Sequence, residues 1–88
     1  MKERSDGEIL AGLIERSRLL IAVSDEIPVE TKLETQPLLK QLEQLLDVPD
    51  GEHDLERIEG THALLCDALA DYGDLDALVS AMRHFLPR

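Results

Sequence analysis

The chain has 88 residues, about half the length of a typical domain of ~150, so we expect a single domain spanning 1–88. Apolar residues make up 43% of the chain and charged residues 32%. This balance excludes an intrinsically disordered chain, in which large aliphatic residues are scarce. Tyr72 and Phe85 are the only aromatic residues, so the hydrophobic core is expected to be small and its stability modest.

The net charge of −10 comes from 19 acidic and 9 basic residues. Recognition of nucleic-acid phosphates needs clustered Lys and Arg, so the composition argues against direct nucleic-acid binding, and against attraction to anionic membranes for the same reason. The charge is unevenly placed. Residues 1–40 hold eight acids and six bases, whereas residues 41–82 hold eleven acids and one base, Arg57. The acidic surface therefore belongs to the second half of the chain.

Nothing in the sequence indicates a membrane-spanning or leader segment. The longest apolar run is Leu19–Val23, far short of the roughly 18–20 residues that a spanning helix needs. The first residues carry mixed charges and lead directly into a helix pattern rather than into an apolar signal region. Cys66 is the single cysteine, so it forms no internal disulfide, as is usual in a reducing compartment. We expect a cytoplasmic protein.

The first predicted helix covers about residues 6–24. Ser5 and Glu8 have the spacing of a capping box, and apolar residues then recur every three to four positions. Leu19 and Val23 fall off this stripe, so the last turn is apolar all round. The favoured interpretation is that this end of the helix is buried more deeply; the alternative is a surface for a partner.

Residues 27–35 alternate between apolar and polar positions, which is the period of a strand. A short helix that begins at Pro28 and is interrupted near Pro37 fits equally well. We favour the helix, because a lone strand has no partner in this chain. From Pro37 the leucines at 38, 39, 42, 45 and 46 predict a helix that extends to about Asp47, and residues 48–51 predict a turn.

Two further helices are predicted in the last third of the chain. The first presents a narrow apolar seam formed by Leu55, Ile58, His62, Leu65, Leu69 and Tyr72. Gly73 is expected to stop this helix and Asp74 to act as the N-cap of the next. The last helix presents apolar residues from Leu75 to Leu86 and is closed by Pro87. The prediction is an all-α fold, a small four-helix antiparallel bundle, or three long helices plus one short.

Candidate catalytic and metal-binding residues are few. His62 and Cys66 lie four residues apart on one helix, but a zinc site needs three or four ligands, and His53 and His84 are predicted in a loop and on an outer helix face. We expect His62 to be a hydrogen-bonded core residue and Cys66 a small buried one. No metal, no cofactor and no enzymatic activity are predicted.

The strongest functional pattern is an acidic face on the third predicted helix. Opposite the seam lies a strip of small residues with acids at its edges, and further acids lie near both helix ends. Small residues let another helix approach closely, and carboxylates favour a basic partner. The predicted partner-binding residues are Glu52, Asp54, Glu56, Glu59, Gly60, Ala63, Asp67, Asp71, Asp74 and Asp76. The alternative is a solvated acidic face whose small residues pack against another helix of the bundle.

Three functional hypotheses follow. The first is a non-enzymatic interaction module, a regulator, adaptor or chaperone that docks a basic or amphipathic protein segment. The second is a DNA mimic that inhibits a nucleic-acid-binding protein with its carboxylates. The third is a metal or redox protein that uses His62 and Cys66. We favour the first, with a homodimer through the apolar end of the first helix as a further expectation.

Overall fold

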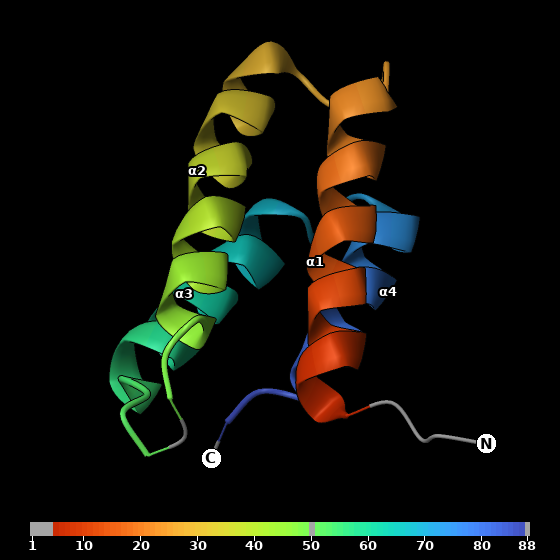
Figure 1. The fold of residues 1–88 in the computed structure, drawn as a ribbon. Helices are drawn as coiled ribbons and strands as arrows, with labels where there is room; N and C mark the ends of the chain where they lie inside the picture. The colour runs from red at the N-terminus through yellow and green to blue at the C-terminus, as the bar shows by residue number, and fades with distance from the viewer. Residues whose placement is uncertain (1–4, 50, 88) are drawn as a thin grey trace, which may run out of the picture.

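Four α-helices form the fold, which a computed structural model describes for residues 5–49 and 51–87. They are α1 (Asp6–Val23), α2 (Val29–Leu46), α3 (Leu55–Ala68) and α4 (Gly73–Met82), and the described residues contain no strand. The chain reverses direction at each connection, so that successive helices are antiparallel (Figure 1). The predicted all-α four-helix bundle is confirmed. In the part of the chain described, no helix has both the length and the apolar character needed to cross a bilayer.

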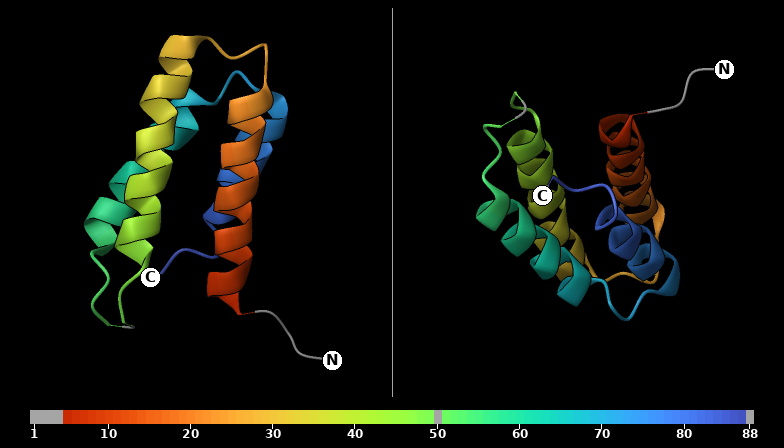
Figure 2. Two further views of the ribbon diagram at one scale, coloured as in Figure 1. Left: turned by 45° about the horizontal axis from the view of Figure 1, so that its top comes forward. Right: turned by 90° about the horizontal axis from the view of Figure 1, so that it is seen from below.

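The helices pack as two pairs. α2 packs mainly against α3, and α1 mainly against α4, whereas the two pairs approach each other less closely (Figure 2). The core between the helices is mainly aliphatic. Its buried members are Leu10, Ile14, Ile21, Ile27, Leu39, Leu42, Ile58, Leu65, Leu69, Leu75, Val79 and Met82. The connections 24–28 and 69–72 join the two pairs at one end of the bundle, and the pairs diverge toward the other end.

The first helix begins as its capping residues predict. The Ser5 hydroxyl accepts a hydrogen bond from the Glu8 backbone N–H at 3.3 Å. The predicted deeper burial of the last turn is wrong, because Leu19 is 56% exposed and Val23 is 72% exposed. No helix of the bundle covers this side of α1, so the two residues remain available as surface.

Residues 29–46 form one continuous helix that runs through Pro37. The helical interpretation of residues 27–35 is therefore supported over the strand, but the predicted interruption at Pro37 is wrong. Pro37 lacks the N–H that would donate within the helix. Its ring is exposed, so the residue does not disturb the packing of the core. The alternation over 27–35 reflects the buried Ile27 in the linker and the buried Thr35, whose hydroxyl donates to the Thr31 carbonyl at 2.8 Å.

The boundary between the third and fourth helices differs from the prediction. α3 ends at Ala68, and α4 already begins at Gly73, so Gly73 is a first helical residue and Tyr72 occupies the N-cap position in place of Asp74. Leu55, predicted in the buried seam, is 43% exposed, because it lies in the first turn where the helix projects beyond the core. After Met82 the chain continues as turns rather than as the predicted helix to Leu86.

Candidate functional site

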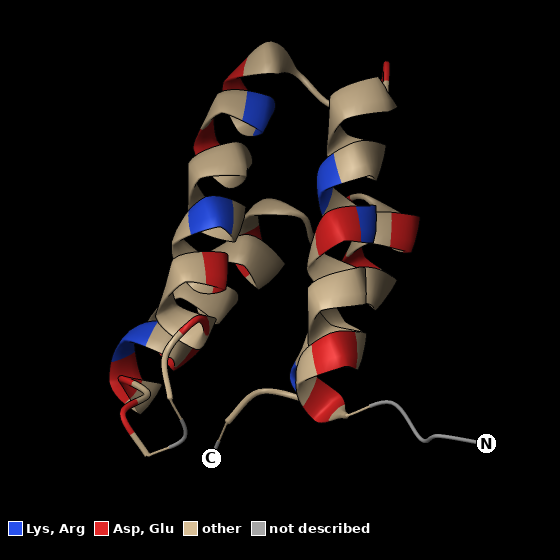
Figure 3. Ribbon diagram, in the orientation of Figure 1, with Lys and Arg blue, Asp and Glu red and all other residues tan. Residues whose placement is uncertain are grey.

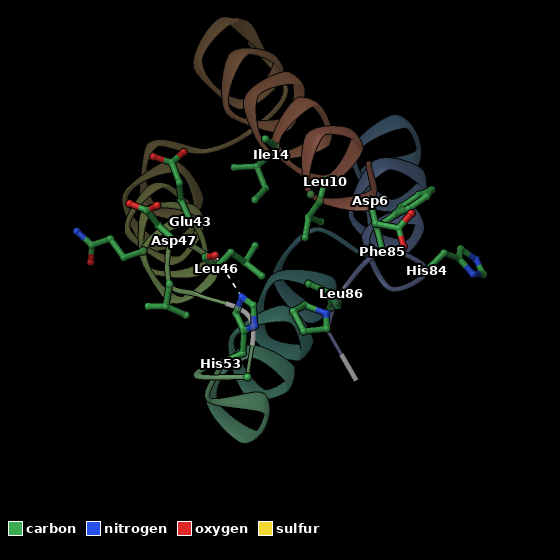
Figure 4. A pocket seen from close by; sticks show the side chains of 16 residues that line it. Asp6, Leu10, Ile14, Glu43, Leu46, Asp47, His53, His84, Phe85 and Leu86 are labelled. Atoms are coloured by element: carbon green, nitrogen blue, oxygen red, sulfur yellow. Dashed lines mark hydrogen bonds between the residues drawn. The ribbon is translucent and has the colours of Figure 1, made fainter. Parts of the chain in front are cut away.

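A cavity of about 1020 Å³ opens at the end of the bundle where the two helix pairs diverge. It lies between the start of α1, the end of α2, the linker that follows α2, and the segment after α4 (Figure 4). Ligand sites in proteins commonly measure about 300–1,000 Å³, so this cavity is large enough for several side chains of a partner.

The cavity is lined by polar and apolar groups in about equal measure, and the apolar side chains lie on its inner wall. Leu10 and Ile14 of α1 are 3% and 2% exposed and are among the residues that line it. Leu46, Phe85 and Leu86 are partly buried and complete the wall, and Figure 4 shows Leu10, Leu46 and Leu86 directed toward the central space. Such a wall favours aliphatic or aromatic groups over polar ones.

The rim of the cavity is acidic. Asp6 lies in the first turn of α1, and Glu43 and Asp47 lie at the end of α2, on the opposite side of the opening. Two histidines also reach this region: His53 donates through Nε2 to the Leu46 carbonyl at 3.3 Å, while the ring of His84 points away from the cavity (Figure 4). An apolar wall with carboxylates on both sides suits an apolar segment flanked by positive charges.

None of the ten predicted partner-binding residues lines this cavity. Nine of them are exposed and Asp76 is half-buried, and they lie on the outer side of α3 and around its ends. Asp54 has a structural role, because its carboxylate caps α3 by accepting from the Arg57 backbone N–H at 3.2 Å. Asp74 and Asp76 lie in the first turn of α4, where acids complement the helix dipole.

The strip of small and acidic residues on α3 is not covered by another helix. Gly60 and Ala63 are exposed, and a Cβ added at Gly60 would meet no atom within 4 Å. The alternative in which these small residues pack against a helix of the same bundle is therefore wrong. The exposed strip stays a candidate surface, and Leu64 beside it is 57% exposed.

The cavity residues were missed because each belongs to a pattern that looks purely structural. The positions of Leu10 and Ile14 match the apolar stripe of a helix. Those of Phe85 and Leu86 match the apolar face of the last predicted helix. The up-and-down order of the helices was the available signal, since it brings the start of α1, the end of α2 and the chain after α4 to one end.

His62 and Cys66 form a structural pair in the core. His62 is 3% exposed and bonds to the Val79 carbonyl at 2.6 Å, which confirms the predicted core histidine. Cys66 is half-buried rather than buried, and its Sγ lies 3.8 Å from His62 Nδ1. Burial raises the pKa of the Cys66 thiol; the Arg83 charge opposes this rise and Asp76 adds to it. The thiol is thus held in its protonated, poorly nucleophilic form near neutral pH.

The described residues contain no group of three or more His, Cys, Asp or Glu side chains placed to hold a metal ion. Comparison with protein-family models, with curated proteins and with solved structures finds no match to this chain. The features that bear on function are therefore the geometry of the cavity and the charges around it.

Proposed function

We propose that this protein is a non-enzymatic interaction module that docks a basic, amphipathic protein segment in the cavity at the open end of the bundle. The observation that carries the proposal is the combination in one place of an apolar wall and an acidic rim, with Asp6 on one side and Asp47 on the other. Apolar anchors of the partner supply the affinity, and the carboxylates select for Lys or Arg beside them.

An amphipathic helix matches this cavity better than an extended peptide does. Helices present apolar residues at intervals of three and four, so that one face fills a groove while the other stays in water. The described part of the chain has no exposed strand edge to which an extended peptide could add. The buried Leu10 and Ile14 lie one helical turn apart and would receive successive anchors of such a segment.

The charge of the chain supports a cationic partner. At a net charge of −10, a positively charged segment is attracted before contact, which speeds association and makes it sensitive to salt. The acids on α3 extend this negative field even though they do not touch the cavity. They form the alternative docking surface, and the test must separate the two locations.

A defined peptide provides that test. The probe is a fluorescently labelled helical peptide with leucines on one face and lysines on the other, titrated with the protein and followed by anisotropy. Replacing Ala11 with Trp fills the cavity from the exposed side of α1. We expect this variant to weaken binding at least tenfold, because a bulky ring takes the space of the peptide's anchors.

The matched control is Ala63→Trp on the outer strip of α3, which adds the same ring to an exposed helical alanine outside the cavity. We expect Ala63→Trp to bind the peptide as the unmodified chain does. The double variant Asp6→Asn with Asp47→Asn should weaken binding several-fold and flatten its salt dependence. If Ala63→Trp abolished binding and Ala11→Trp did not, docking would belong to α3 and the cavity proposal would fail.

A further inference from the structure

A second concave surface lies on the outer side of the α1–α2 pair. It is a groove of about 650 Å³ whose wall is mainly apolar, with Leu33 and Pro37 of α2 at its centre. Leu33 is 70% exposed, and Val29, one turn earlier on α2, is 69% exposed. Leu33 and Val29 are thus two exposed aliphatic side chains on one face of α2, beside a concave surface, and contiguous exposed apolar surface is typical of interaction sites.

This groove concentrates positive charge in a protein that is otherwise strongly acidic. The structure describes six basic residues, and three of them, Arg18, Lys32 and Lys40, line the groove. Arg18 is paired with Glu43 at 2.6 Å and with Glu15 at 3.1 Å, so its charge is largely compensated. The charges of Lys32 and Lys40 remain to attract a partner; Figure 3 shows basic segments of α1 and α2 on this side of the molecule.

The groove is held open by contacts between its two helices. Gln36 donates through Nε2 to the Arg18 carbonyl at 3.4 Å, and Lys32 Nζ donates to the Ala22 carbonyl at 3.4 Å. Both bonds join α2 to α1 beside the groove. The groove is therefore formed before a partner arrives, which lowers the entropy cost of binding.

A matching surface is present on the same chain, on the outer side of α3. Lys32 and Lys40 are eight residues apart on α2, and Glu59 and Asp67 are eight residues apart on α3. At 1.5 Å per residue each pair spans about 12 Å along its helix, so the opposite charges have the same spacing. Between the two acids lies Ala63, a small exposed residue over which another surface can approach closely.

We propose that the α1–α2 groove binds a second copy of this chain through the outer face of that copy's α3. In this contact Lys32 and Lys40 of one copy pair with Glu59 and Asp67 of the other, while Leu33 packs over Ala63. The contact joins two different surfaces, so one copy keeps a free α3 face and the other a free groove, and assembly continues or closes as a ring. A two-fold dimer of grooves is disfavoured, because it would place Lys32 and Lys40 against one another's positive charges.

Two charge-reversal variants test this contact. One carries Lys32→Glu and Lys40→Glu in the groove, and the other carries Glu59→Lys and Asp67→Lys on α3. Lys40, Glu59 and Asp67 are exposed and Lys32 is half-buried, and circular dichroism would verify that each variant keeps its helices. At low salt we expect the unmodified chain to show a mass above that of one 9.8 kDa chain in sedimentation velocity, rising with concentration. Each variant alone should assemble at least tenfold more weakly.

Mixing the two variants gives the decisive result. The unmodified α3 face of the groove variant fits the unmodified groove of the α3 variant, so an equimolar mixture should regain a mass above 9.8 kDa. The control carries Glu30→Lys and Glu34→Lys, the same charge change on exposed α2 residues that do not line the groove, and should assemble as the unmodified chain does.

Three outcomes would overturn the proposal. The first is a single-chain mass for the unmodified protein at every concentration at low salt. The second is a mixture of the two variants that stays monomeric. The third is a dimer whose mass is unchanged in both charge-reversal variants but which dissociates in the double variant Leu19→Asp with Val23→Asp. That result would place a two-fold contact at the apolar end of α1. Peptide binding in the cavity is measured separately, so either proposal can fail while the other stands.

Discussion

His62 on α3 donates through Nε2 to the backbone carbonyl of Val79 on α4, at 2.6 Å. A carbonyl oxygen only accepts, so Nε2 carries a proton; the Cys66 sulfur lies beside the ring, 3.6 Å from Nε2 and 3.8 Å from Nδ1. At the end of α4 the N–H of Arg83 bonds to the Ser80 carbonyl, one residue short of a regular α-helical bond. His62 therefore provides the donor for a carbonyl that the last turn of α4 would otherwise leave without one, and it joins α3 to α4.

Replacing His62 with Ala is expected to lower the free energy of unfolding by about 2–4 kcal/mol, because it leaves both a cavity and a buried carbonyl without a donor. Urea denaturation followed by circular dichroism measures this loss. His84→Ala, at an exposed histidine, is the control and should change stability by less than about 0.5 kcal/mol. Equal effects of the two changes would contradict the assigned role of His62.

Cys66 is expected to make stability depend on pH in the alkaline range. Burial raises the pKa of its thiol in the folded chain above the ordinary value of 9.0. The unfolded chain therefore loses this proton first, so the thiol's contribution is complete below the unfolded pKa and is lost as pH rises through the folded pKa. The free energy of unfolding of the unmodified chain should fall more steeply above pH 9.0 than that of Cys66→Ala. Parallel curves for the two proteins would show that the thiol is not responsible.

Two variants of Asp54 separate the contribution of its capping hydrogen bond from that of its negative charge. Asn is as good an N-cap as Asp, so Asp54→Asn should keep the stability of the chain, whereas Asp54→Ala should lower it by about 1 kcal/mol. Thermal and urea unfolding of the two variants provides the comparison. If Asp54→Asn were as unstable as Asp54→Ala, the negative charge near the α3 dipole would matter more than the hydrogen bond.

Pro37 should be replaceable with a gain in stability. It lies inside α2 and has no N–H to donate to the Leu33 carbonyl, while its ring is exposed. Pro37→Ala restores that donor, and we expect the free energy of unfolding to rise by about 1–3 kcal/mol. A chemical denaturation curve shifted to higher urea would establish this. An unchanged midpoint would mean that the helix has already adapted to the missing bond.

Local patterns determined the helical fold. The Ser5 cap, the three-to-four spacing of apolar residues in α1, and the leucines of the second half of α2 each depend on neighbours within one or two turns, so the sequence alone was sufficient to predict them. The buried positions of Ile58, His62, Leu65 and Leu69 follow from the same periodicity. The predictions were wrong where tertiary packing overrides local preference. At Pro37 the packing of the core face of α2 keeps the helix continuous despite a residue that disfavours helix.

The exposure of helix surfaces and the meeting of distant segments were decided only by the tertiary structure. Leu19 and Val23 fall off the apolar stripe of α1, but the sequence left open whether another helix covers them, and the structure leaves both exposed. The cavity brings Leu10, Leu46 and Leu86 to one space from three distant parts of the chain, because the helix pairs are joined at one end and diverge at the other. The sequence determines the charge of each helix and the spacing of its apolar residues. Which faces meet, and which remain free for a partner, depends on how the four helices pack together.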